Sequence, residues 1–280
     1  MPEIELSQGK VHYREQGDGP PIVLIHGLLV NGRVWDRLVE VLSPHARCIV
    51  PDLPLGSHRV AMRDGADLSM PGIARLVAEL LERLELEGVT LVGNDTGGAI
   101  CQLVAARHPE RLGRLVLTNC DAFENFPPPA IRRAVAAMKL PGVIGGLALG
   151  ARFRRVRNAA FSVMPLTMQP IPDELVKSWV APLSNRRVRA DLAKVVRGID
   201  SSHTLAAAEA LRDFDRPTLI AWGERDRFFP FADAERLAST IPQSRLERIP
   251  DARTFVQVDA PQRLADLIVS VTNGAGAAVA

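Results

Sequence analysis

The sequence contains little tyrosine and cysteine, and it has no long apolar run. Tyr13 is the single tyrosine, and the three cysteines, Cys48, Cys101 and Cys120, lack the spacing of a metal site or a disulfide framework. No apolar stretch approaches the roughly 20 residues that cross a bilayer, and the N-terminus lacks the features of a secretory signal. These absences argue against a membrane-spanning or disulfide-stapled protein. We therefore expect a cytoplasmic chain with reduced, buried thiols.

Charge of either sign is not in excess. The net charge is +2 with both signs mixed along the chain, which points to neither nucleic acid nor membrane as a partner. No metal-ligand spacing and no dinucleotide fingerprint occur, so we expect no metal and no cofactor. The expected partner is a small-molecule substrate or ligand. The sequence gives no indication of the oligomeric state.

What the chain does contain is an alternation of apolar runs and amphipathic segments. Strands are predicted at residues 9–15, 21–25, 48–50, 89–92, 115–118, 217–222 and 246–249, the first two forming a meander. Helices are predicted at residues 32–42, 71–84, 99–107 and 261–271. This alternation predicts an α/β protein, with a mainly parallel sheet covered by helices on both faces.

The alternation breaks in the middle of the chain. After Phe126 come three prolines and then an irregular, arginine-rich helical stretch. We interpret residues 126–212 as a helical cap inserted between two parts of one core, residues 1–125 and 213–272. Residues 273–280 are rich in glycine and alanine and are predicted to form a flexible tail.

The most informative segment is Gly93-Asn94-Asp95-Thr96-Gly97-Gly98, between a predicted strand and a predicted helix. Glycines around a central side chain at such a junction are typical of a nucleophile elbow, whose sharp turn presents that side chain above the sheet. A carboxylate at this position attacks through oxygen and forms an ester on the enzyme. The competing interpretation of Asp95, a plain helix N-cap, does not require the flanking glycines.

Five segments in order resemble those of the α/β-hydrolase superfamily, over nearly the full chain. They are Leu24-Ile25-His26-Gly27, Pro51-Asp52-Leu53-Pro54, the elbow segment, Ala221-Trp222-Gly223-Glu224-Arg225-Asp226 and Ile249-Pro250-Asp251-Ala252. The resemblance implies an α/β-hydrolase fold with a mostly parallel, eight-stranded sheet flanked by helices. The aspartate at the elbow and the helical cap resemble most the haloalkane dehalogenase and epoxide hydrolase branch.

This resemblance implies roles for particular residues. Asp95 corresponds to the nucleophile, and Asp226 corresponds to the acid that orients a catalytic histidine; a plain loop carboxylate is the alternative for Asp226. The backbone N–H groups of Leu28 and Thr96 correspond to the oxyanion hole. His26 corresponds to a structural histidine of the superfamily, so we do not interpret it as the base.

The histidine position departs from the superfamily pattern. Where the superfamily reads Asp-Ala-Gly-His-Phe, this chain reads Asp251-Ala252-Arg253-Thr254-Phe255. A threonine cannot accept a proton from water near neutral pH, whereas an imidazole can. An ester on Asp95 would therefore lack its usual hydrolytic base. We expect at most one fast turnover, followed by a trapped adduct.

The substrate-side groups depart as well. Thr96 and Leu28 stand where haloalkane dehalogenases hold the halide with tryptophan and often asparagine. The cap has no tyrosine, which epoxide hydrolases use to protonate the epoxide oxygen, and a serine-type esterase would need serine or cysteine at position 95. Standard dehalogenation, epoxide hydrolysis and ester hydrolysis are therefore not expected.

Other polar residues are candidates for the pocket. His58 and His203 are the histidines placed to replace the missing base, although solvent-facing loop positions would also explain them. Arg253 is predicted to place its guanidinium between the two acids in a static ion-pair network. Asn119 is predicted to donate a hydrogen bond to a ligand and Asp121 to add a carboxylate, with solvated polar residues of the cap hinge as the alternative.

Apolar cap residues suggest an apolar pocket, although this spacing is also typical of a cap's own core. They are Phe123, Phe126, Met138, Leu140, Phe153, Phe161, Met164 and Trp179. The sequence thus predicts an enzyme that acts through Asp95 on a small, largely apolar molecule, with an incomplete triad. The alternative is an inactive relative that binds or senses a small molecule. An introduced Thr254 that traps an intermediate is a third interpretation, but it would not need a change at Arg253.

Overall fold

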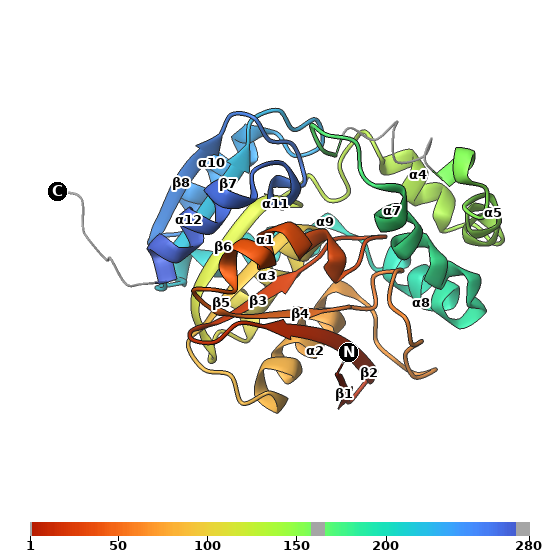
Figure 1. The fold of residues 1–280 in the computed structure, drawn as a ribbon, viewed down its shortest axis with the longest axis horizontal. Helices are drawn as coiled ribbons and strands as arrows, with labels where there is room; N and C mark the ends of the chain where they lie inside the picture. Colours follow the sequence, from red (N-terminus) through yellow and green to blue (C-terminus); the bar gives the residue numbers. More distant parts are fainter. Residues whose placement is uncertain (1, 158–165, 273–280) are drawn as a thin grey trace.

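A computed structural model describes residues 2–157 and 166–272. Eight strands form one sheet in the order β1-β2-β4-β3-β5-β6-β7-β8 (Figure 1). The strands are β1 Glu3–Leu6, β2 Gly9–Gln16, β3 Pro21–Ile25, β4 Arg47–Pro51, β5 Val89–Asp95, β6 Leu112–Cys120, β7 Thr218–Gly223 and β8 Ser244–Ile249. β1 and β2 run antiparallel to their neighbours and all other pairs are parallel. The predicted fold class, a mostly parallel eight-stranded sheet flanked by helices, is confirmed.

Helices cover both faces of this sheet (Figure 1). They are α1 Asp36–Leu42, α2 Met70–Arg83, α3 Thr96–Arg107, α10 Phe231–Thr240, α11 Val256–Asp259 and α12 Pro261–Thr272. α1 packs against α12, and α2 packs against α3. In α2 the apolar residues recur at helical spacing and are buried, and the Ser69 hydroxyl caps the helix by accepting the N–H of Gly72.

The predicted N-terminal meander is wrong. β2 pairs with β4, with Tyr13 opposite Pro51, and β3 lies on the far side of β4. The reason is burial: β3 is apolar at every position and is enclosed between β4 and β5, whereas the more polar β2 lies nearer the sheet edge. The short strand β1 and the helix α10 were not predicted.

The segment predicted as a cap lies between β6 and β7 in the chain. Its helices are α4 Arg132–Met138, α5 Val143–Gly150, α7 Asp173–Val180, α8 Arg186–Arg197 and α9 Ser201–Ala210. α4, α5, α7 and α8 extend beyond one end of the sheet, whereas α9 packs against α3 (Figure 1). The predicted tail, residues 273–280, lies outside the described residues. Within those residues, no single helix combines the length and apolar character needed to cross a membrane.

Candidate active site

Asp95 lies at the carboxyl end of β5, at the junction with α3. Its backbone has φ 56° and ψ −135°, a conformation that costs a non-glycine residue free energy. The turn depends on small neighbours. A Cβ on Gly97 would lie 2.3 Å from the carbonyl oxygen of Ile25, and one on Gly93 would lie 2.7 Å from the Cys101 sulfur. The glycines therefore permit the sharp turn that presents the Asp95 side chain.

One oxygen of Asp95 is held by the residue that follows it. Oδ1 accepts the backbone N–H of Thr96 and lies 3.0 Å from the Thr96 hydroxyl. The backbone N–H of Leu28 also donates toward this carboxylate. Gly27 leaves room for it, because a Cβ there would lie 2.5 Å from the Asp95 Cβ. The two amides that the sequence assigned to an oxyanion hole thus converge on Asp95 itself.

The electrostatics of Asp95 follow from its position. Burial raises the pKa of Asp95 to about 6, against the opposing effect of the hydrogen bonds from Thr96 and Leu28. The charge of Asp226 raises this pKa further. A carboxyl group whose pKa is raised by burial and by a nearby acid is a candidate functional residue.

Asp121 lies beside the same threonine. The Thr96 hydroxyl is 3.0 Å from Asp95 Oδ1 and 3.0 Å from Asp121 Oδ2. One hydroxyl has one proton, so both contacts are hydrogen bonds only when a carboxyl is protonated. Burial and the charge of Asp95 raise the pKa of Asp121 well above its usual range. The Thr96 hydroxyl therefore links the two carboxyl groups of Asp95 and Asp121.

Asp226 follows β7 and is held by four donors. Its Oδ1 accepts the backbone N–H groups of Phe228 at 2.7 Å and Phe229 at 3.3 Å, and the Thr254 hydroxyl at 3.1 Å. Its Oδ2 accepts the Asn119 amide at 2.8 Å. Burial nevertheless raises the pKa of Asp226. The neighbouring Arg225 pairs with Asp251 instead.

The side-chain amide of Asn119 is hydrogen-bonded within the protein. Its Oδ1 accepts the N–H of Gly223 at 2.7 Å, and its Nδ2 donates to the Gly223 carbonyl at 3.1 Å and to Asp226. Both amide protons are thereby used. The prediction that Asn119 donates to a ligand is wrong, because the residue ties the end of β6 to the end of β7.

Thr254 lies in the loop between β8 and α11 and is fully buried. Besides its bond to Asp226, its carbonyl accepts the side-chain amide of Asn94 at 2.7 Å. The adjacent Arg253 points elsewhere: its guanidinium donates to the carbonyl of Thr167 at 3.0 Å, and its backbone N–H donates to Asp259 at 3.0 Å. The predicted ion-pair network of Arg253 between Asp95 and Asp226 is therefore wrong.

His58 is buried and paired with an acid. Its Nε2 lies 3.2 Å from Oδ2 of Asp191 on α8, and the same oxygen accepts the N–H of Met62 at 2.9 Å. Its Nδ1 is buried and has no hydrogen-bond partner among the described residues. The solvent-facing interpretation is thus wrong for His58. A carboxylate orients its ring, which is how an acid positions a catalytic imidazole.

Two further histidines, His203 and His26, differ from His58. His203 lies in the first turn of α9, is partly exposed and is close to Asp200. His26 is fully buried, and both of its ring nitrogens are used, Nδ1 with the carbonyl of Gly27 at 2.9 Å and Nε2 with the N–H of Leu53 at 2.9 Å. Its contacts are those of a structural residue.

The apolar cap residues divide into two groups. Phe123, Phe126, Met138 and Trp179 are buried, and the Trp179 ring packs edge-on against Phe255 at 6.0 Å, next to Thr254. Leu140 and Phe153 are 62% and 64% exposed, so their predicted place in a pocket is wrong. Phe161 and Met164 lie outside the described residues.

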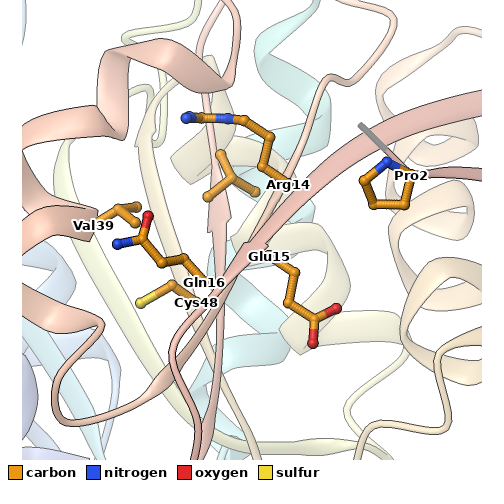
Figure 2. Close-up of a pocket in the computed structure, with 7 residues that line it drawn as sticks. Pro2, Arg14, Glu15, Gln16, Val39 and Cys48 are labelled. Atoms are coloured by element: carbon orange, nitrogen blue, oxygen red, sulfur yellow. The ribbon is translucent and has the colours of Figure 1, made fainter.

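Two surface hollows in the described part of the chain lie away from Asp95. One, of about 270 Å³, is lined by residues of β2, β4 and α1 (Figure 2). Its charged groups are satisfied, since Arg14 pairs with Asp36 at 2.7 Å and Glu15 with Arg47 at 2.7 Å. Burial raises the pKa of the Cys48 thiol there to about 11, so it is not a nucleophile. The other, of about 360 Å³, lies between α1 and α12.

Comparison with known proteins gives a consistent set of relatives. A family described as alpha/beta hydrolase fold matches residues 20–261. The chain is 29% identical over 275 residues to haloalkane dehalogenase 2 of Mycobacterium tuberculosis, covering 95% of this chain and 92% of that protein. It is 30% identical over 276 residues to a cis-3-alkyl-4-alkyloxetan-2-one decarboxylase of Xanthomonas campestris, covering 91% of this chain and 90% of that protein. These relatives are enzymes.

Solved structures agree at the level of the fold. A meta-cleavage product hydrolase from Pseudomonas fluorescens superposes with a TM-score of 0.79 at 21% identity, covering 98% of this chain and 97% of the other. A haloalkane dehalogenase from Bradyrhizobium elkani superposes with a TM-score of 0.76 at 21% identity, covering 96% and 97%.

Proposed function

Because this chain belongs to the alpha/beta hydrolase fold family, we propose that it is an enzyme whose nucleophile is Asp95 and whose histidine position is occupied by Thr254. One observation carries the proposal: the carboxylate of Asp95 sits on a strained turn, with Oδ1 held by Thr96. Strain of this kind concentrates at functional sites. With Oδ1 held, Oδ2 is the oxygen that attacks.

The second step decides the reaction type. In a hydrolase, water attacks the ester on the nucleophile, and a base must take its proton. Thr254 cannot do so, and it already donates its hydroxyl to Asp226. A reaction that consumes no water avoids this requirement. We therefore favour a fragmentation over a hydrolysis.

The oxetanone decarboxylases among the relatives suggest such a reaction. Loss of carbon dioxide from a four-membered lactone leaves an alkene, with no water in the balance. Attack by Asp95 Oδ2 on the alkyl carbon breaks the ring C–O bond and releases a carboxylate within the same molecule. The C–C bond to that carboxylate then breaks, its electron pair forms the alkene, and Asp95 leaves as a carboxylate. The substrate class is a small, largely apolar strained lactone.

The test is intact-mass analysis together with product analysis. The protein is incubated separately with a cis-dialkyl oxetan-2-one, an epoxide, a haloalkane and an activated ester. We expect the lactone to yield an alkene with repeated turnover, and the haloalkane to leave a stoichiometric adduct. Both results should disappear in Asp95→Asn and persist in Asp36→Asn, which removes the same charge on α1.

The outcomes separate the alternatives. Turnover of the haloalkane would contradict the proposal that no base hydrolyses the ester on Asp95. His58 would then be the candidate base. Adduct formation without alkene would retain Asp95 as the nucleophile and reject the fragmentation. The absence of both adduct and product would favour an inactive relative that binds a small molecule.

A further inference from the structure

The outer part of the cap exposes large apolar side chains. We call residues 132–156, which include α4 and α5, the cap tip. Five of its side chains are more than half exposed: Leu140 at 62%, Leu147 at 52%, Leu149 at 58%, Phe153 at 64% and Val156 at 51%. Elsewhere in the described chain, no large hydrophobic residue is more than 38% exposed. Such a concentration on a protein surface marks an interaction site.

Helix α5 has no polar face. Its sequence from Val143 to Gly150 contains only aliphatic residues and glycine, and Ile144 is its one buried residue. A helix that is apolar all round normally lies inside a protein or in contact with lipid. Gly145 and Gly146 are not explained by packing, because a Cβ on either would meet nothing within 4 Å. The apolar surface of α5 is thus left largely uncovered by the described residues.

The sequence around this surface is rich in basic residues, and the nearby acids Asp173 and Asp200 lie outside the segment. From residue 125 to 172 the sequence has seven basic and no acidic side chains, although the whole chain has 34 basic and 32 acidic ones. The basic residues are Arg132, Arg133, Lys139, Arg152, Arg154, Arg155 and Arg157. Arg154 and Arg157 contact Asp173. The other five are exposed and form no ion pair within the described residues.

Neither helix of the cap tip is long enough to span a membrane alone. α5 has eight residues and is about 12 Å long at 1.5 Å per residue, far short of a bilayer core of about 30 Å. α4 and α5 also meet at a bend of 106°. The pair lies at the end of the molecule remote from β8 (Figure 1). A short apolar helix between cationic side chains suits the boundary between headgroups and acyl chains.

We propose that the cap tip docks on the surface of an anionic lipid bilayer. Leu147, Leu149 and Phe153 enter the boundary, and the exposed arginines contact lipid phosphates; these are Arg132, Arg133, Arg152 and Arg155. A second copy of this chain is a poorer occupant, because two cap tips would bring like charges together. This inference differs from the sequence-based expectation of no membrane partner, because the net charge of the whole chain conceals the local excess. It does not depend on the reaction at Asp95.

Co-sedimentation of the full chain with vesicles tests the proposal. Binding is compared between pure phosphatidylcholine and mixtures with phosphatidylglycerol, at low and high salt. We expect binding only to the anionic vesicles. Arg132→Gln with Arg133→Gln should weaken it by roughly fivefold for each arginine. The matched control is Arg245→Gln with Arg248→Gln, which removes the same charge from exposed positions on β8 and should leave binding unchanged.

A second pair of variants tests the apolar contact. Leu149→Gln should weaken binding by roughly tenfold, whereas Leu205→Gln, at an exposed leucine on α9, should not. Circular dichroism checks that each variant is folded. Equal effects of the cap-tip and β8 charge variants, or no effect of Leu149→Gln, would overturn the proposal in favour of unspecific charge attraction. No binding to anionic vesicles would also overturn it, as would lipid-free self-association that Leu149→Gln abolishes.

Discussion

The hydroxyl of Thr254 donates to Oδ1 of Asp226 across 3.1 Å. In a triad of this fold, the acid at this position would receive a proton of the catalytic imidazole. Here the carboxylate is satisfied by the threonine, by the backbone of Phe228 and Phe229, and by Asn119. The carboxylate oxygens of Asp226 thus accept four hydrogen bonds, none of them from a histidine.

The first prediction concerns this hydroxyl. Thr254→Val keeps the shape of the side chain and removes one of the four donors to Asp226. We expect a loss of about 1 kcal/mol in the free energy of unfolding, measured by urea denaturation, because three donors remain. Thr240→Val, which removes a hydroxyl bonded to the carbonyl of Arg236 on α10, is the control and should cost less. Equal losses in the two variants would show that the bond to Asp226 stabilises the fold no more than an ordinary hydroxyl–carbonyl bond on a helix.

The second prediction concerns an imidazole introduced at position 254. In the double variant Arg253→Gly with Thr254→His, an imidazole would stand beside Asp226. We expect the haloalkane adduct on Asp95 to clear with time, so that one turnover becomes steady-state hydrolysis. Mass spectrometry of the adduct over time and release of halide measure this change. Adding Asp226→Asn to the double variant should slow the clearing, because the imidazole loses its orienting acid.

An adduct as durable as in the parent protein, in a folded double variant, would contradict this prediction. Arg253→Gly alone separates the two changes. It removes the guanidinium that donates to Thr167 but adds no base. It should therefore leave the adduct trapped.

The sequence was sufficient for most strands, because apolar runs such as β3 have no other stable place than the sheet interior. The sharp turn at Asp95 was also predictable, since the glycines on both sides leave no room for a Cβ atom. The order of the N-terminal strands was not, because pairing depends on which edge each strand meets. Two hydrogen bonds could not be predicted because their partners are far apart in sequence. They are the bond from the Asn119 side chain to Gly223 and the bond from the Arg253 guanidinium to Thr167. The acid partner of His58 lies 133 residues later and leaves no local pattern.

The third prediction concerns Asn119. Asn119→Ala removes three hydrogen bonds and leaves the backbone N–H and carbonyl of Gly223 buried without these partners. We expect a loss of about 2–4 kcal/mol in the free energy of unfolding, because unsatisfied buried polar groups are costly. Asn125→Ala removes two bonds from a partly buried amide and is the comparison, with a smaller expected loss. A loss at Asn119 no larger than at Asn125 would mean that water replaces the missing bonds.

The last prediction uses the pH dependence of stability. The pKa of Asp95 in the folded protein is about 6, above its ordinary value of 3.8. Between these two values the folded chain holds a proton that the unfolded chain has lost, so stability falls as pH rises through this window. Above it, the penalty is on the order of 2–3 kcal/mol. Asp95→Asn has no such charge. It should match the parent near pH 3 and exceed it by most of that amount at pH 8.

Asp67 provides a control of opposite sign. The Ser69 hydroxyl, which donates to it, lowers the pKa of Asp67 in the folded protein, and Arg75 adds to this effect. Its contribution is therefore present above the unfolded pKa and lost as pH falls. Asp67→Asn should be less stable than the parent at pH 8 and should approach it at low pH. Urea denaturation of both variants across pH measures the two trends. A gain from Asp95→Asn that is the same at every pH would instead reflect relief of the strained turn, because backbone strain does not titrate.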